Sequence, residues 1–222
     1  MKELLLGMGR LAEERLQDAI RALVERDHTL LADVVAGDSR LNDLQMAIDE
    51  RCFTLIALHQ PVAVDLRTIV SILKINADLE RVGDLAVNIA ETGQRYLAHP
   101  PVKPLVDVPR MGDLALKMLR EALEAFLKGD VGRANAVLQQ DDWLDELRNQ
   151  VFRELLTYML SAPRTIEPGT ELILISRHLE RVGDHATNIA EDVIFLVEGR
   201  DVRHGGNRTP AVERRKPRTF PA

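Results

Sequence analysis

Apolar residues recur every three or four positions along most of the chain, which is the spacing of amphipathic helices. In the first segment this spacing is followed by Leu11, Ala12, Leu16, Ala19, Ile20 and Leu23. Similar patterns predict helices over about 30–59 and 66–98, the first of them broken or bent at Gly37, and again over about 112–128, 131–160 and 169–198. Aromatic residues are only 4% of the chain, which favours helix packing over a β-sandwich. We therefore expect an all-α protein.

The chain contains an internal duplication. Residues 8–27 align with 111–130 at an offset of 103, with eight identical positions, and residues 79–91 (LERVGDLAVNIAE) align with 179–191 (LERVGDHATNIAE) at an offset of 100, with eleven. Two matches in the same order are typical of a tandem repeat. The sequence thus predicts two tandem three-helix bundles.

The predicted units are residues 1–98 and 110–199, joined by a connector over 99–109 that carries four prolines. The change of offset falls in the turns near 60–65 and 161–169. There Asp65 is expected to cap the following helix, and Pro168 suits a first helical turn. Residues 200–222 form a basic tail of net charge +5 with three prolines, which we expect to be disordered.

The third helix of each unit carries a repeated row of oxygen-bearing side chains. On a helical wheel these residues lie away from the apolar stripe, and they are Glu80, Asp84, Asn88 and Glu91 in the first unit and Glu180, Asp184, Asn188 and Glu191 in the second. Carboxylates four residues apart repel each other unless a cation lies between them. Oxygen ligands suit hard cations such as iron, manganese or magnesium.

Two interpretations of this acidic row remain open. In one it is a solvated helix face, with Asp84 paired to Arg81 and Asp184 to Arg181. In the other it binds a metal, with further ligands from the acids of the second helix, namely Asp38 and Asp43 in the first unit and Asp141 and Asp145 in the second. Glycine is costly inside a helix, so the retained Gly83 and Gly183 suggest that something approaches closely beside the acids.

The net charge and the composition of the chain argue against several classes of function. The net charge is −6 overall and −11 without the basic tail, which argues against nucleic acid as a ligand. The one cysteine, Cys52, excludes an internal disulfide and a thiolate metal cage. No apolar run is long enough for a signal peptide or a membrane span, so a cytoplasmic location is expected, with membranes contacted only through partners.

Catalytic patterns are missing from the sequence. The one Glu-x-x-His, Glu25–His28, has no counterpart in the second unit, and no HExxH or glycine-rich phosphate loop occurs. His178 and His185 align with Asp78 and Leu85, so they lie outside the repeated pattern and are expected at the surface. Trp143, which aligns with Arg40, is expected in the core, with a contact in a dimer as the alternative. A non-enzymatic protein is the prediction.

At its two LERVGD…NIAE segments the chain resembles the PhoU family. The resemblance extends through GDSRLNDLQMAIDE (37–50), QPVAVDLR (60–67) and LVEGRDVRHGGN (196–207), and covers about residues 5–207. It implies two antiparallel three-helix bundles that commonly form a homodimer. It also implies metal clusters on the acidic motifs, which here are Glu80 with Asp84 and Glu180 with Asp184.

The function implied by the resemblance is negative regulation of the phosphate regulon. Such a protein couples the ATPase of a phosphate-specific ABC transporter to a sensor histidine kinase. Two rival hypotheses remain: a metal-free helical adaptor whose acidic faces bind basic partner surfaces, and a carboxylate-metal enzyme, which the missing catalytic patterns disfavour.

Overall fold

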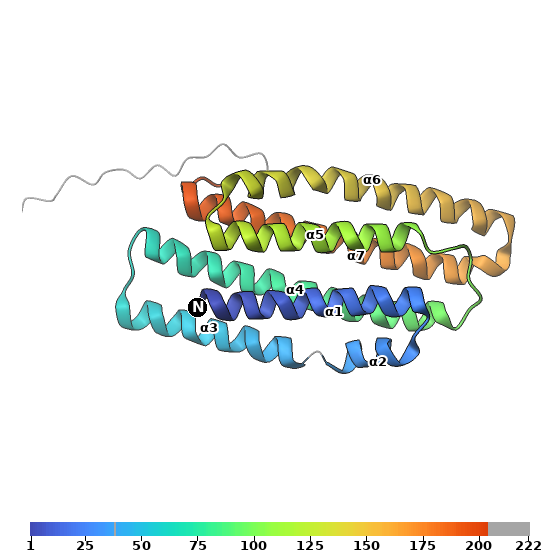
Figure 1. The fold of residues 1–222 in the computed structure, drawn as a ribbon, viewed down its shortest axis with the longest axis horizontal. Helices are drawn as coiled ribbons and strands as arrows, with labels where there is room; N and C mark the ends of the chain where they lie inside the picture. The colour runs from blue at the N-terminus through green and yellow to red at the C-terminus, as the bar shows by residue number, and fades with distance from the viewer. Residues whose placement is uncertain (38, 204–222) are drawn as a thin grey trace, which may run out of the picture.

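The computed structural model describes residues 1–37 and 39–203. The first repeat consists of helices α1 (Lys2–Glu25), α2 (His28–Ala36), α3 (Ser39–His59) and α4 (Val64–Leu97). The second consists of α5 (Asp107–Lys128), α6 (Val131–Ser161), a 3₁₀ turn η1 (Pro163–Thr165) and α7 (Ile166–Glu198). The helices run side by side along the long axis of the molecule (Figure 1). The predicted fold of two tandem helical bundles is confirmed.

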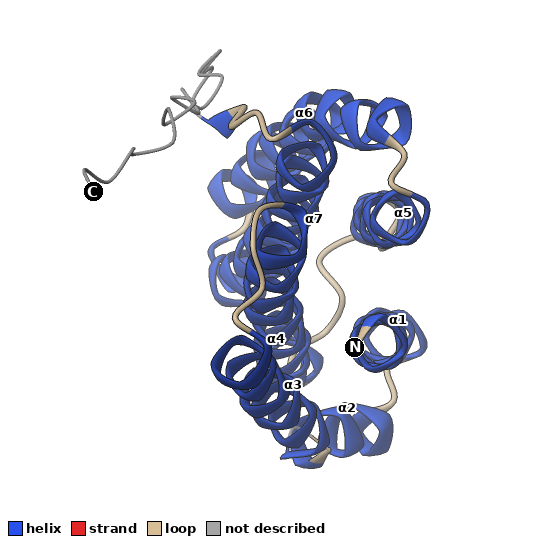
Figure 2. Ribbon diagram, turned by 90° about the vertical axis from the view of Figure 1, so that its left-hand side faces the viewer, coloured by secondary structure: helices blue, strands red, loops and turns tan. Residues whose placement is uncertain are grey.

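The helices form two layers. Seen end-on, α2 and α3, then α4, α7 and α6 make one curved layer, and α1 and α5 lie against its concave side (Figure 2). The two bundles meet mainly where α4 packs against α7, with a second contact between α1 and α5. Helix α4 runs antiparallel to α7, because Lys74 contacts Asp192 whereas Arg95, further along α4, contacts Glu171.

The contact between α1 and α5 explains two of the glycines retained in both repeats. A Cβ atom on Gly9 would lie 2.6 Å from Cδ1 of Leu123, and one on Gly112 would lie 2.5 Å from Cδ1 of Ile20. Both distances are shorter than van der Waals contact, so each glycine makes room for a side chain of the opposite helix. Gly9 and Gly112 were therefore kept for packing between the repeats.

The second helix of the first repeat breaks where Gly37 indicated. Helix α2 ends at Ala36, and α3 begins again at Ser39. Arg15 of α1, only 7% exposed, donates hydrogen bonds to the carbonyl oxygens of Val34 and Gly37 and so satisfies the end of α2. In the second repeat the corresponding α6 is continuous over Val131–Ser161.

Two predictions about individual helix positions were wrong. Asp65 does not cap α4, because the helix already begins at Val64 and Asp65 lies in its first turn. Trp143 is not in the core but 62% exposed, because its neighbour Leu144 occupies the buried position on α6. Pro168 does lie in the first turn of α7, as expected.

The end of the chain was predicted to be a basic, disordered tail. The predicted tail begins at residue 200; residues 200–203 are described, and there Arg203 pairs with Asp201. Residues 204–222 lie outside the described part, so their disorder stays a prediction. Within residues 1–37 and 39–203, none of the helices has the length and apolar content needed to cross a membrane.

Candidate functional site

The second repeat gathers four carboxylates where α6 packs against α7. Glu180 and Asp184 come from α7, and Asp141 and Asp145 come from α6. The close approach depends on Gly183, because a Cβ there would overlap Cδ2 of Leu144 and lie 3.6 Å from Oδ1 of Asp141. In the first repeat a Cβ on Gly83 would lie 3.0 Å from Cδ1 of Leu41.

These contacts confirm the close approach expected at the two retained glycines and show that a leucine makes it. Gly83 and Gly183 admit a leucine of the neighbouring helix, so helix packing accounts for both of them without a ligand. The contacts also show which residues of the two repeats correspond. Leu41 and Leu144 occupy equivalent places, as the offset of 103 predicts.

The four carboxylates of the second repeat interact unfavourably. Partial burial, followed by repulsion from Asp184, Asp145 and Asp142, raises the pKa of Asp141 to about 6. Burial and the charge of Asp184 raise the pKa of Glu180, and burial and the charge of Asp145 raise that of Asp184. The folded chain thus holds negative charges together at a cost in free energy, and a cation placed among them would reduce that cost.

One arginine already lies in this cluster. Nη2 of Arg148 on α6 is 3.3 Å from Oε1 of Glu180 and 3.5 Å from Oδ1 of Asp145. Because the guanidinium connects α6 to α7, it neutralises part of the surplus charge and links the two helices.

The first repeat carries a sparser version of the cluster. Glu80 and Asp84 have side chains 18% and 36% exposed, and Arg81 of the same helix lies 3.6 Å from the first and 3.2 Å from the second. The Arg81–Asp84 pair expected for a solvated face is therefore present. Asp43 is exposed on α3, whereas the residue equivalent to Asp145 is Asn42. Asp38 lies outside the described residues.

The other polar residues of the predicted row lie outside the two acidic clusters. Nδ2 of Asn188 donates to Oδ1 of Asp78 on α4, 3.2 Å away. Glu191 lines a separate pocket of about 310 Å³ with Lys74 and Arg203. In the first repeat Asn88 is half-buried and Glu91 is exposed. The eight-residue row is thus not one continuous site.

The two histidines were expected at the surface, and this was wrong. Nδ1 of His185 lies 2.8 Å from Oδ1 of Asp78, with both side chains largely buried. His178 is half-buried, and burial together with the charges of Arg181 and Arg177 lowers its pKa. Both histidines lie on the side of α7 that packs against α4, which a comparison of the repeats alone could not reveal.

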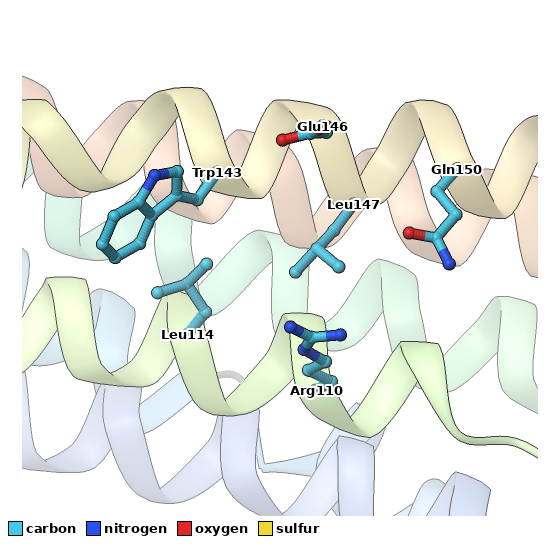
Figure 3. Close-up of a pocket in the computed structure, with 6 residues that line it drawn as sticks. All are labelled: Arg110, Leu114, Trp143, Glu146, Leu147 and Gln150. Carbon is cyan, nitrogen blue, oxygen red and sulfur yellow. The ribbon is translucent and has the colours of Figure 1, made fainter.

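The exposed Trp143 lines a pocket that sequence reasoning missed. The pocket has a volume of about 490 Å³ and lies between α5 and α6. Figure 3 shows the indole and Leu147 pointing from α6 towards Leu114 of α5, with Arg110 and Gln150 further along the groove. An exposed tryptophan beside leucines is typical of a surface that binds apolar groups.

The donor chemistry of the acidic clusters fits a hard cation, because it consists of carboxylate oxygens. Among residues 1–37 and 39–203, however, no three carboxylate, histidine or cysteine side chains already stand together in a metal-binding arrangement. Binding by the described residues alone would therefore require side-chain rearrangement, including a change at Arg148.

The fold and these surfaces define a duplicated helical-bundle protein with acidic faces. The PhoU domain model matches residues 5–93 and 108–193, and the chain therefore belongs to the PhoU family. The resemblance seen in the sequence motifs is confirmed.

Several relatives are closely similar. The phosphate-specific transport system accessory protein PhoU homolog of Caulobacter vibrioides is 45% identical over 196 residues, which cover 88% of this chain and 85% of that protein. The homolog of Pseudomonas aeruginosa is 43% identical over 203 residues, 91% of this chain and 84% of its own.

Solved structures agree with the fold. The crystal structure of PhoU from Pseudomonas aeruginosa matches with a TM-score of 0.86 at 41% identity, covering 89% of this chain and 95% of that one. PhoU from Streptococcus pneumoniae, described as a phosphate transport system regulatory protein, matches with a TM-score of 0.83 at 31% identity, covering 90% and 94%.

Proposed function

We propose that this chain is a cytoplasmic, non-enzymatic negative regulator of the phosphate regulon. It couples the ATPase of a phosphate ABC transporter to a sensor histidine kinase. The observation that carries the proposal is the match of the PhoU domain to both repeats, together with relatives named as phosphate-specific transport system accessory proteins.

The gene deletion tests the regulatory proposal. A strain without the gene is expected to express alkaline phosphatase in phosphate-rich medium, and the wild-type gene supplied in trans is expected to restore repression. Unchanged alkaline phosphatase output in the deletion strain would refute negative regulation. Capture of the full chain with the transporter ATPase and with the kinase from cell membranes would test the two partners separately.

The proposal includes binding of a hard cation such as iron, manganese or magnesium by the acidic clusters. Glu80 with Asp84 and Glu180 with Asp184 would hold it, and Asp145 and Asp141 would support the second site. Burial and the surplus negative charge together raise the pKa of Asp141 to about 6, and this surplus charge supports the role. A bound cation would stabilise the fold by offsetting that repulsion.

A metal-free adaptor is the second candidate, and the ion pairs of Arg81 and Arg148 favour it, because they already neutralise part of each cluster. Elemental analysis of protein purified without chelator distinguishes the two. The metal proposal expects bound metal that falls when Glu80→Ala and Glu180→Ala are combined. Metal content that does not change would exclude these ligands.

A homodimer is also proposed, and exposed apolar side chains support it. Phe53 and Leu58 on α3, and Leu160 at the end of α6, are large apolar residues open to solvent. Light scattering coupled to size-exclusion chromatography measures the mass directly. A mass of about 25 kDa, that of one chain, at micromolar concentration would contradict the dimer.

A further inference from the structure

The arginine in the second acidic cluster has no equivalent in the first. Leu41 and Leu144 pack against Gly83 and Gly183, so the residues that follow them correspond one by one. In the alignment of the two repeats, Asn42 corresponds to Asp145. Three positions later, Gln45 corresponds to Arg148. The second repeat therefore has one more carboxylate and one more cation, placed i and i+3 on the same helix.

The surroundings of Arg148 show that its guanidinium acts as a counter-ion. It contacts a carboxylate of its own helix, Asp145, and one of α7, Glu180, at 3.5 and 3.3 Å. Its side chain is only 33% exposed, and its buried Nε atom has no hydrogen-bond partner. The side chain is thus held at the helix interface by its contacts with these acids.

We propose that Arg148 is the resident counter-ion of the second cluster and competes with an external cation for Glu180 and Asp145. The inference rests on the proposed metal function and makes the two repeats unequal cation sites. In the first repeat Arg81 pairs with Glu80 and Asp84 from an exposed position on the same helix, with a side chain 62% exposed. At the position equivalent to Arg148, the first repeat has the uncharged Gln45.

The competition is electrostatic. A divalent cation among Glu180, Asp184 and Asp145 would lie within several ångströms of the guanidinium. At about 6 Å, a single and a double positive charge repel each other enough, even at the dielectric constant of water, to change a dissociation constant about tenfold. Removing the arginine also leaves Glu180 and Asp145 available as ligands.

The experiment is a Mn²⁺ titration by isothermal calorimetry on the full chain. The first repeat is silenced by Glu80→Gln with Asp84→Asn in the parent and in every variant compared with it, so that the heat reports on the second repeat. The unsilenced wild-type chain is titrated alongside them. Arg148→Gln, which installs the residue of the first repeat, is compared with Arg153→Gln. Arg153 is exposed on the same helix, so this control removes the same charge from another face.

Arg148→Gln is expected to bind Mn²⁺ about tenfold more tightly than the silenced parent, and Arg153→Gln within about twofold of it. The double variant Asp145→Asn/Arg148→Gln removes one negative and one positive charge. Its affinity for Mn²⁺ is expected to lie between those of the silenced parent and Arg148→Gln. If Arg148→Gln alone unfolds, the double variant replaces it in the comparison. Tighter Mn²⁺ binding by the double variant than by the silenced parent then supports the inference, and equal or weaker binding overturns it.

The outcomes separate this inference from the metal function itself. If the parent binds Mn²⁺, loses binding on Glu180→Gln and binds equally well after Arg148→Gln, the inference fails and the metal proposal stands. If neither the unsilenced wild-type chain nor any variant binds Mn²⁺, metal binding fails and the inference fails with it.

Discussion

Asp141 is expected to destabilise the folded protein at neutral pH. Burial and the charges of Asp184, Asp145 and Asp142 raise the pKa of its carboxyl from an ordinary 3.8 to about 6. The folded chain then binds this proton more tightly than the unfolded chain does. For a carboxyl shifted upwards, stability is lost as the pH rises from about 4 to about 6 and stays reduced above that range. Asp141→Asn removes the ionisable group and should therefore stabilise the protein.

The size of the pKa shift of Asp141 sets the expected change in the free energy of unfolding. At 1.36 kcal/mol for each pH unit, a rise from 3.8 to about 6 corresponds to roughly 3 kcal/mol. The side chain is partly open to solvent, which screens the repulsion, so we expect about 1–2 kcal/mol. The gain of Asp141→Asn over wild type should be absent near pH 4, grow as the pH rises to about 6 and stay constant above that.

Urea denaturation between pH 4 and pH 8, without divalent cations, measures this difference. Glu146→Gln is the matched control, because Glu146 carries the same charge on the same helix, is exposed and is not among the charges that raise the pKa of Asp141; a change below about 0.5 kcal/mol is expected there. If Asp141→Asn lowers the unfolding free energy at pH 7.5, or if its effect does not depend on pH, the burial and charge repulsion inferred at Asp141 are wrong.

Three further substitutions test individual contacts in different parts of the fold, each by urea denaturation. Gly183→Ala should lose about 1 kcal/mol, although alanine favours helix, because its Cβ overlaps Leu144; a more stable variant would contradict the close approach. Arg15→Ala should lose about 2 kcal/mol, because two carbonyl oxygens at the end of α2 lose a charged donor, and a loss below about 0.5 kcal/mol would show that water replaces it. Lys103→Ala should lose about 2 kcal/mol, because Asp107, 2.6 Å away and mostly buried, loses its partner; equal stability at pH 7 would refute this.

The sequence by itself determined the helices, the duplication and the acidic face of each third helix. These features are local or repetitive. A period of 3.6 residues fixes the direction of each side chain around its own helix axis, and a repeat can be seen by aligning the chain with itself. Glu80, Asp84, Glu180 and Asp184 could therefore be selected as candidate residues before any coordinates were known.

The tertiary structure decided which residues meet across the helices. It placed Arg148 against Glu180, His185 against Asp78 and Leu144 against Gly183, and it left Trp143 exposed. None of these contacts follows from spacing, because the angle of a residue on its own helix does not reveal which helix lies opposite or at what height. That depends on how two helix surfaces interlock, which is a property of the packed bundle as a whole.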